Sequence, residues 1–331
     1  MRIVTVVAAL AVTLMASEVF AVQSRCLVGK SKCVAKKVGS LLKCEQHAET
    51  PWKDTDPNAG DCVHKAQEKF DGGSDPAKGC FEKLENRVPN DCLTFDDTAA
   101  TEAVVDACLA HLVDAIDPPP LEQTRCGVGK KKCVAKTLSG LLKCFQKAQT
   151  PGGPTDPNSA GCVDKATSKF DGGSDPSMGC VAKLESKIGN DCLPPVGNTG
   201  GLSRLVDSCT TALLTRLEAT LPAGCEAVVG GFCWVLGAPG ASCDAACAGI
   251  GKVCSTATAS YAGGGGTDAK CENVLIALGA PGTFGYDDPC SDYPGQFGCF
   301  RDSSTGAQGR CKSSTTCSDT LAGFERVCAC E

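Results

Sequence analysis

Apolar positions recur with helical spacing over two stretches of the chain, near residues 24–49 and 124–149. In the first stretch Cys26, Cys33 and Cys44 are separated by 7 and 11 residues, which places them within about 20° of one another on a helix of 100° per residue. The lysines fall mostly outside this stripe (Lys30, Lys32, Lys36, Lys37 and Lys43). The pattern predicts a long helix that buries its cysteines and exposes its lysines.

Turn signals divide the residues after each long helix into three further helices. Asp56-Pro57 and Asp75-Pro76 each offer an N-cap residue followed by proline at the first helical position, and Gly72-Gly73 ends the helix between them. A last helix is predicted where apolar residues share helical spacing, at Val104, Val105, Cys108, Leu109, Leu112 and Val113, and again at Leu202, Leu205, Val206, Cys209, Leu213 and Leu217.

The two stretches are copies of one repeat with an offset of about one hundred residues. RCLVGKSKCVAKKVGSLLKC begins at Arg25, and RCGVGKKKCVAKTLSGLLKC begins at Arg125. The cysteines of the first copy are Cys26, Cys33, Cys44, Cys62, Cys80, Cys92 and Cys108, and those of the second are Cys126, Cys133, Cys144, Cys162, Cys180, Cys192 and Cys209. We expect two near-identical four-helix units.

Composition divides the chain into four parts. Residues 1–21 are typical of a signal peptide, because Arg2 precedes an apolar run that ends in the small-x-small site Val19-Phe20-Ala21. Residues 22–121 and 122–222 hold the two repeats, joined by a proline-rich linker at Asp117–Pro120. Residues 223–331 differ in composition, since all three tyrosines lie there.

The last part is predicted to be a small α+β domain. Ser242 and Thr267 are expected helix caps, residues 298–311 read as a hairpin, and residues 326–330 read as a terminal strand in which side-chain alternation predicts different partners for Cys328 and Cys330. Its cysteines are even in number (Cys225, Cys233, Cys243, Cys247, Cys254, Cys271, Cys290, Cys299, Cys311, Cys317, Cys328 and Cys330) and are expected to pair within the domain. The whole fold is therefore expected to be mainly α, with two tandem disulfide-stapled four-helix repeats before a small disulfide-rich α+β domain.

The cysteine content indicates the cellular compartment. The chain has 26 cysteines in 331 residues, a density that persists only where disulfides are stable. It contains neither C-x-x-C nor C-x-x-C-H, which argues against a thiolate metal site and against c-type haem. No run after the signal peptide is long and apolar enough for a transmembrane segment. We expect a secreted protein, extracellular or periplasmic, without a cofactor or a metal.

An odd number of cysteines in each repeat leaves one without an internal partner. Cys44 and Cys62 flank the turn between the first two helices and are the first choice for a bond. We expect the leftover cysteine to be equivalent in both copies, either Cys26 with Cys126 or Cys108 with Cys209. The two leftover cysteines can form a bond between the copies, or they can link whole chains to one another through disulfides.

Two segments resemble known groups of proteins. The lysine-rich helix that ends in LLKC, the motif C-V-x-K-A-x-x-K-F and the late D-C-L resemble cysteine-rich helical repeats of uncharacterised exported bacterial proteins, over Arg25–Leu221. The SCxxxC start and CxC finish of the last domain resemble a cysteine-rich appendage found beside some N-acetylglucosaminyltransferases. The first group has no established activity, so the resemblance implies no catalytic residue.

Several candidate sites have a structural explanation. His47, His64 and His111 are expected on solvated helix surfaces, because the second repeat lacks them. The acidic segment Lys53–Asp61 resembles a calcium loop, but its sixth and twelfth positions lack the required glycine and glutamate. Trp234 is expected in the core, and Gly263–Gly266 is expected to be a flexible linker.

One loop combines aromatic rings with carboxylates, which suits a sugar or a cation. Its residues are Tyr286, Asp287, Asp288, Asp292, Tyr293 and Phe297. The net charge of −6 argues against nucleic acid as a partner. We expect a non-enzymatic binding or structural protein whose partner is an extracellular protein or a glycan. A small enzyme or carbohydrate-active module that uses the carboxylates of the last domain, and an inhibitor or toxin-like module, are the alternatives.

Overall fold

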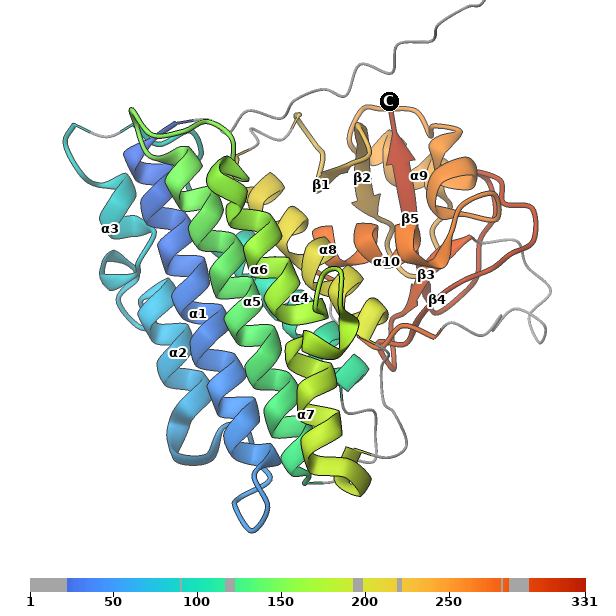
Figure 1. Cartoon of the computed structure of the whole chain (residues 1–331). Coiled ribbons are helices and arrows are strands. Elements are labelled where there is room, and N and C mark those ends of the chain that lie inside the picture. Colours follow the sequence, from blue (N-terminus) through green and yellow to red (C-terminus); the bar gives the residue numbers. More distant parts are fainter. Residues whose placement is uncertain are drawn as a thin grey trace, which may run out of the picture.

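The structure is a computed structural model, and it describes residues 23–89, 91–116, 123–192, 199–218, 222–280, 282–285 and 298–331. The expected signal peptide, the Asp117–Pro120 linker and the loop 286–297 lie outside the described residues. Two helical units, here called the first unit (23–116) and the second unit (123–218), precede a domain that contains a five-stranded antiparallel sheet (Figure 1).

Both units contain four α-helices in the same order, as expected. The first unit has α1 (Arg25–Glu49), α2 (Cys62–Asp71), α3 (Glu82–Glu85) and α4 (Thr98–Ile116), and the second has α5 (Arg125–Gln149), α6 (Cys162–Asp171), α7 (Cys180–Ile188) and α8 (Thr199–Glu218). The third helix differs most, with 4 residues in α3 and 9 in α7. Ser24 and Thr124 cap the long helices through their side-chain oxygens.

The start of the second helix differs from the sequence-based expectation. α2 begins at Cys62 rather than directly after Asp56-Pro57, because Gly60 and Asp61 adopt left-handed conformations with φ of 64° and 59°. Asn58 caps the first turn in place of Asp56, since its Oδ1 accepts two backbone N–H groups of the helix at 3.1 and 3.2 Å. The segment is therefore a capped turn that leads into a helix.

The long helices α1 and α5 lie side by side and antiparallel at the centre of the two units (Figure 1). The side-chain amide of Gln23 donates to the carbonyl oxygen of Gly153 at 2.9 Å, and that of Gln123 donates to the carbonyl oxygen of Lys53 at 2.9 Å. Gln23 corresponds to Gln123 and Lys53 corresponds to Gly153 in the two repeats. Each unit therefore makes the same contact with the other. The two units are therefore related by an approximate twofold axis between the helices.

Disulfides attach the short helices of each unit to its long helix. The bonds are Cys26–Cys92, Cys33–Cys80 and Cys44–Cys62 in the first unit, and Cys126–Cys192, Cys133–Cys180 and Cys144–Cys162 in the second. The remaining cysteines, Cys108 and Cys209, bond α4 to α8 with a Cα–Cα distance of 5.4 Å. The structure thus confirms the Cys44–Cys62 pair and selects the bond between the units, and no cysteine among the described residues is free.

The last domain is a sheet with strand order β1-β2-β5-β3-β4, covered by two helices. The strands are β1 (Ala227–Val229), β2 (Phe232–Leu236), β3 (Cys299–Asp302), β4 (Gln308–Arg310) and β5 (Phe324–Cys330), and the helices are α9 (Cys243–Gly249) and α10 (Asp268–Ala277). The expected helix caps, the hairpin of β3 with β4 and the terminal strand are all present.

Cys328 and Cys330 have different partners, but the expected reason is wrong. Residues two apart on a strand point to the same face, so both cysteines face α9. They bond to Cys243 and Cys247, which are one helical turn apart. The other recorded bonds are Cys225–Cys233, Cys254–Cys317 and Cys271–Cys299, and Cys311 is also disulfide-bonded, whereas Cys290 lies outside the described residues. No bond recorded among the described residues joins this domain to either unit.

One hydrophobic core continues from the two units into the last domain, because α10 packs against α4 and α8. This contact buries His111, whose exposed fraction is 3% and whose Nδ1 lies 3.4 Å from Oε1 of Glu272, so the expectation of a solvated His111 is wrong. Trp234 is fully buried as expected. No helix in the described part of the chain is both long and apolar enough to span a membrane.

The Gly263–Gly266 segment is a packed turn and not the expected linker. A Cβ on Gly264 would lie 1.9 Å from the carbonyl oxygen of Ser313, so only glycine fits. The guanidinium of Arg310 donates to the carbonyl oxygen of Gly263 at 3.1 Å. The carbonyl groups of the turn therefore bind the side chain of Arg310, and the turn does not form a phosphate-binding loop.

The bond between Cys108 and Cys209 predicts the thiol content of the protein. Titration of the denatured, unreduced chain should find no reactive thiol, and non-reducing electrophoresis should show a monomer. The double variant Cys108→Ala/Cys209→Ala should still fold, because six other disulfides hold the units, but with a stability lower by about 2–4 kcal/mol. Two thiols per wild-type chain, or a disulfide-linked dimer, would contradict this connectivity.

Candidate functional site

A cleft of about 890 Å³ opens on the surface of the second unit, between α5 and α6, and the start of α1 forms one edge. Two disulfides, Cys133–Cys180 and Cys144–Cys162, attach its walls to α5. Six lysines line it: Lys32 from α1, Lys136, Lys143 and Lys147 from α5, and Lys165 and Lys169 from α6. Rigid walls around mobile charged side chains are suited to binding.

No ion pair within the described part of the chain compensates the charge of the cleft lysines. The lining residues that the structure describes include no carboxylate, and none of the six lysines forms an ion pair there. Two unit charges 10 Å apart repel by about 0.4 kcal/mol in water, and more where protein displaces the solvent. A multivalent anion relieves this repulsion at several lysines at once, so the cleft favours anions although the chain has a net charge of −6.

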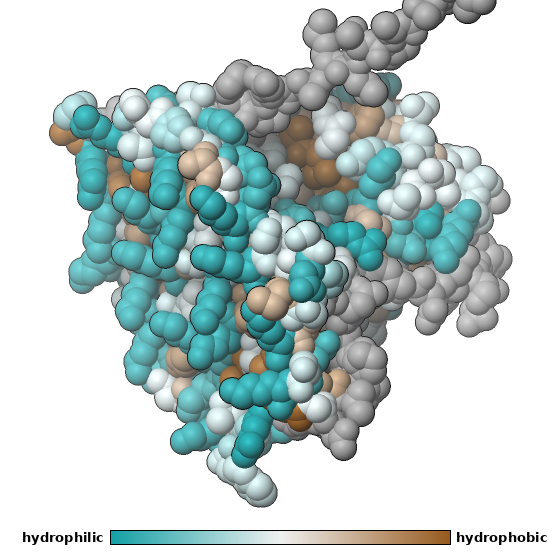
Figure 2. Space-filling view, in the orientation of Figure 1, coloured by the Kyte–Doolittle hydropathy of each residue, from teal (hydrophilic) through white to brown (hydrophobic). Residues whose placement is uncertain are grey.

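The cleft belongs to a longer basic stripe on α5. Arg125, Lys132, Lys136, Lys143 and Lys147 are all exposed, and steps of 7, 4, 7 and 4 residues keep them within about 60° of one another around the helix. Figure 2 shows hydrophilic side chains over the face that α1 and α5 form. The spacing of these cations in the sequence of the second repeat is the signal that predicts the stripe.

The two units have different residues at two equivalent positions that line the cleft in the second unit. Lys37 of the first unit is fully buried, where its Nζ contacts Glu102 at 2.5 Å and Asp106 at 3.0 Å and lies 5.0 Å from the ring centroid of Phe70. The second unit has the shorter Thr137 at the corresponding position, and Gly140 replaces Ser40. Both changes remove side-chain volume from the wall, so the two units differ at the position where the cleft lies.

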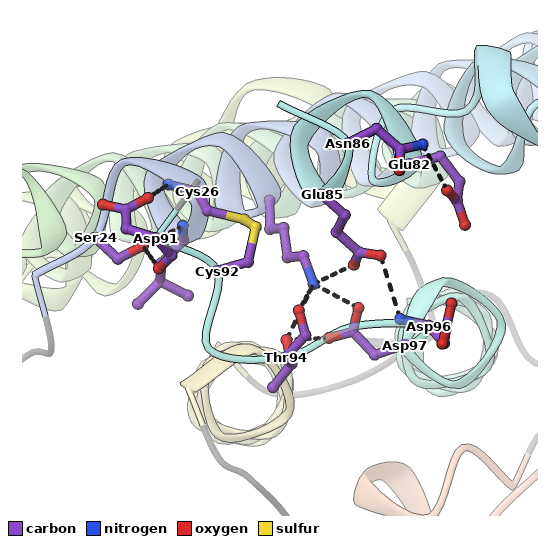
Figure 3. Close-up of polar contacts among 12 residues, drawn as sticks. Ser24, Cys26, Glu82, Glu85, Asn86, Asp91, Cys92, Thr94, Asp96 and Asp97 are labelled. Carbon is purple, nitrogen blue, oxygen red and sulfur yellow. Dashed lines mark hydrogen bonds and ion pairs between the residues drawn. A yellow bond between two sulfur atoms is a disulfide. The ribbon is translucent and has the colours of Figure 1, made fainter. Parts of the chain in front are cut away.

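The structure corrects the expected exposure of two lysines in the first long helix. Lys37 is buried as described, and Lys30 is buried against Glu85 and Asp97, with Nζ–O distances of 2.5 and 2.7 Å (Figure 3). Their carboxylate partners lie more than 50 residues away in sequence, which is why helical spacing alone could not show the burial. Lys32, Lys36 and Lys43 are exposed as expected.

Three carboxylates near Lys30, those of Glu82, Glu85 and Asp96, lie within 4.8 Å of one another and could approach a metal ion. Glu85 is already paired with Lys30, and its Oε2 accepts the backbone N–H of Asp96 at 3.2 Å (Figure 3). The cluster is therefore explained as part of the ion-pair network that holds α3 and the start of α4 against α1.

Asp91 fixes the N-terminal end of α1 next to the cleft. Its carboxylate accepts the backbone N–H groups of Arg25 at 2.7 Å and Cys26 at 2.9 Å (Figure 3). Burial acts to raise the pKa of Asp91, but these hydrogen bonds and those around Ser24 hold the pKa below its ordinary value. The negative charge at the helix N-terminus stabilises the first turn of α1.

A second, smaller cleft of about 350 Å³ lies between α8, β1 and α10. It contains Arg204 and Asp207 at its edge and small polar residues along its wall. Burial, and then the charge of Asp171, raises the pKa of Asp207 above its ordinary value. One cation beside one carboxylate gives this cleft no excess of charge, so it is a weaker candidate than the lysine-lined cleft.

The candidate residues proposed from the sequence alone lie outside the described residues. This applies to all six, Tyr286, Asp287, Asp288, Asp292, Tyr293 and Phe297. Their role stays a prediction. The comparisons add no independent indication, because no family model, no curated protein and no solved structure matches this chain.

Replacement of Lys30 tests the buried network. In Lys30→Met two buried carboxylates lose their cation, so the free energy of unfolding should fall by about 3–5 kcal/mol. Denaturant unfolding measures this loss. The matched control Lys36→Met, at an exposed position of the same helix, should change stability by no more than about 0.5 kcal/mol. Equal effects of the two variants would contradict the network.

Proposed function

We propose that this chain is an exported, non-enzymatic binding protein, built by duplication of a four-helix unit, and that it binds a multivalent anion in the lysine-lined cleft of the second unit. The observation that carries the proposal is the presence of six lysines around one cleft that has no carboxylate among its described lining residues. The predicted signal peptide and the dense disulfides support export to an oxidising compartment.

The side chains of the cleft are suited to binding rather than to group transfer. Lysine ammonium groups are compact point charges on flexible stems, which adapt to phosphate, sulfate or carboxylate groups at varying positions. Gln146 adds an amide group, while the hydroxyls of Thr137 and Thr150 already donate to the carbonyl oxygens of Cys133 and Gln146. The cysteines of the lining are all oxidised. This set provides cations and hydrogen-bond donors, which is the chemistry of anion recognition.

The two units differ in sequence at the position of the cleft. In the first unit Lys37 fixes α2 and α4 through its buried contacts. In the second unit Thr137 and Gly140 stand at the positions of Lys37 and Ser40, and both line the cleft. The smaller side chains of the second unit therefore favour a hollow at this place.

Neutralisation of the cleft tests the proposal. Tripolyphosphate is a suitable probe, and calorimetric titration at about 50 mM salt should show binding to the wild type that weakens as salt increases. In Lys136→Gln/Lys143→Gln/Lys147→Gln three ion pairs are lost. Exposed pairs contribute up to about 1 kcal/mol each, and about 1.4 kcal/mol corresponds to a tenfold change, so we expect affinity to fall tenfold or more.

A charge-matched variant away from the cleft is the control. Lys78→Gln/Lys83→Gln/Lys312→Gln changes the net charge by the same amount and should retain affinity within about twofold. Equal weakening by both triple variants would indicate a general field effect and reject the cleft. Lack of tripolyphosphate binding by the wild type at 50 mM salt would reject the proposal altogether.

A substitution that fills the cleft separates shape from charge. A Cβ on Gly140 would lie 3.4 Å from the Cβ of Ala166, so the longer side chain of Gly140→Met extends into the cleft without replacing any lysine. We expect tripolyphosphate affinity to fall about tenfold while thermal stability is retained, since methionine favours a helix more than glycine does. Unchanged affinity in this variant would place the anion outside the cleft.

A further inference from the structure

Trp52 is held in full contact with solvent at the turn that follows α1. Its exposed fraction is 97%, and its backbone φ is 69°, a left-handed value that is uncommon for a bulky residue. The side chain of Gln123 holds the turn in place, because its Oε1 accepts the N–H of Trp52 at 3.2 Å. Neither the backbone conformation nor the exposure of the ring stabilises the fold.

The second unit shows which residue the turn itself favours. Gly152 stands at the corresponding position with φ of 76°, a conformation that glycine adopts without strain. The first unit has tryptophan there instead, on the same kind of turn. Stability alone therefore does not account for Trp52, and strain of this kind is often retained at binding sites.

Trp52 lies at one end of the basic stripe of α5. Together with Arg125 and Val128 it lines a hollow of about 300 Å³ at the start of that helix. The stripe then continues through Lys132 and Lys136 into the cleft, over about 33 Å from Arg125 to Lys147 at 1.5 Å per residue. An aromatic ring thus lies at one end of a row of exposed cations.

We propose that the multivalent anion is an acidic polysaccharide, with one sugar ring stacked on Trp52 and its carboxylate or sulfate groups on Lys132, Lys136 and the cleft lysines. A pyranose ring has an apolar face that packs on an indole ring, while its charged substituents point outward. The inference rests on the proposed function of the cleft and extends it to a second subsite.

Other polyanions fit the face less well. A membrane surface is flat, whereas the lysines are arranged around a concave cleft. Single-stranded nucleic acid is bound by successive aromatic rings along a groove, and this stripe offers one ring at its end. A chain of charged sugars fits these two features, because one sugar ring can stack on the single aromatic ring while the charged groups contact the row of cations.

The test uses the fluorescence of the two tryptophans, since Trp234 is fully buried and serves as an internal reference. An oligogalacturonate and a sulfated oligosaccharide of similar length separate the carboxylate source from the sulfate source. At least one of them should shift the emission of Trp52 to shorter wavelength in the wild type. Trp52→Gly should lose this shift and bind the same oligosaccharide at least fivefold more weakly.

Two controls separate binding from folding. Trp52→Gly should melt at the same temperature as the wild type or higher, because glycine relieves the strained turn, and it should bind tripolyphosphate with unchanged affinity. Trp52→Tyr keeps an aromatic face and should restore most of the oligosaccharide affinity.

Three outcomes would overturn the inference. The first is equal oligosaccharide binding by Trp52→Gly and the wild type. The other two are a shift of Trp52 emission with single-stranded DNA but with neither oligosaccharide, and such a shift with anionic phospholipid vesicles alone. If tripolyphosphate binds through the lysines while Trp52→Gly has no effect, only the second subsite fails. If the wild type does not bind tripolyphosphate, the cleft itself fails.

Discussion

Two 25-residue helices, α1 and α5, lie antiparallel along each other, and every disulfide within the two units begins on one of them. Each short helix is positioned by its bond to a long helix, and the reciprocal contacts of Gln23 and Gln123 align the long helices. The bond between Cys108 and Cys209 then closes the arrangement at α4 and α8. The start of α1 forms one edge of the cleft because this contact places it beside the end of α5.

The approximate symmetry of this contact is broken by chemistry at equivalent positions. Ser31 donates to Gln149 at 2.8 Å, whereas the corresponding contact is a buried ion pair between Lys131 and Glu49 at 2.9 Å. A charged pair on one side and a neutral pair on the other distinguish the two units. A unit packed against a second copy of itself would place Glu49 opposite Ser31, or Lys131 opposite Gln149, and would leave a buried charge without its partner. The units also differ at the cleft of the second unit, where Thr137 and Gly140 stand at the positions of Lys37 and Ser40.

Helical spacing and cysteine spacing predicted most of the scaffold. The long helices, the Cys44–Cys62 bond and an equivalent leftover cysteine follow from local pattern, because each depends on residues within one or two turns or on the duplication itself. The burial of Lys30 and His111 does not follow, since their partners Glu85, Asp97 and Glu272 come from distant segments. The cleft does not follow from local pattern either, because side chains from α1, α5 and α6 must meet to form it.

The central claim is that the lysines of the cleft in the second unit bind the negatively charged groups of the ligand. The lysines are acetylated with limiting reagent, with and without tripolyphosphate. Mass spectrometry then measures the reactivity of each lysine of the chain in one experiment. The account predicts that Lys136, Lys143 and Lys147 become severalfold less reactive when the anion is present, while Lys83 and Lys312, exposed elsewhere on the surface, do not change. Uniform protection of all exposed lysines, or protection of none, would contradict it.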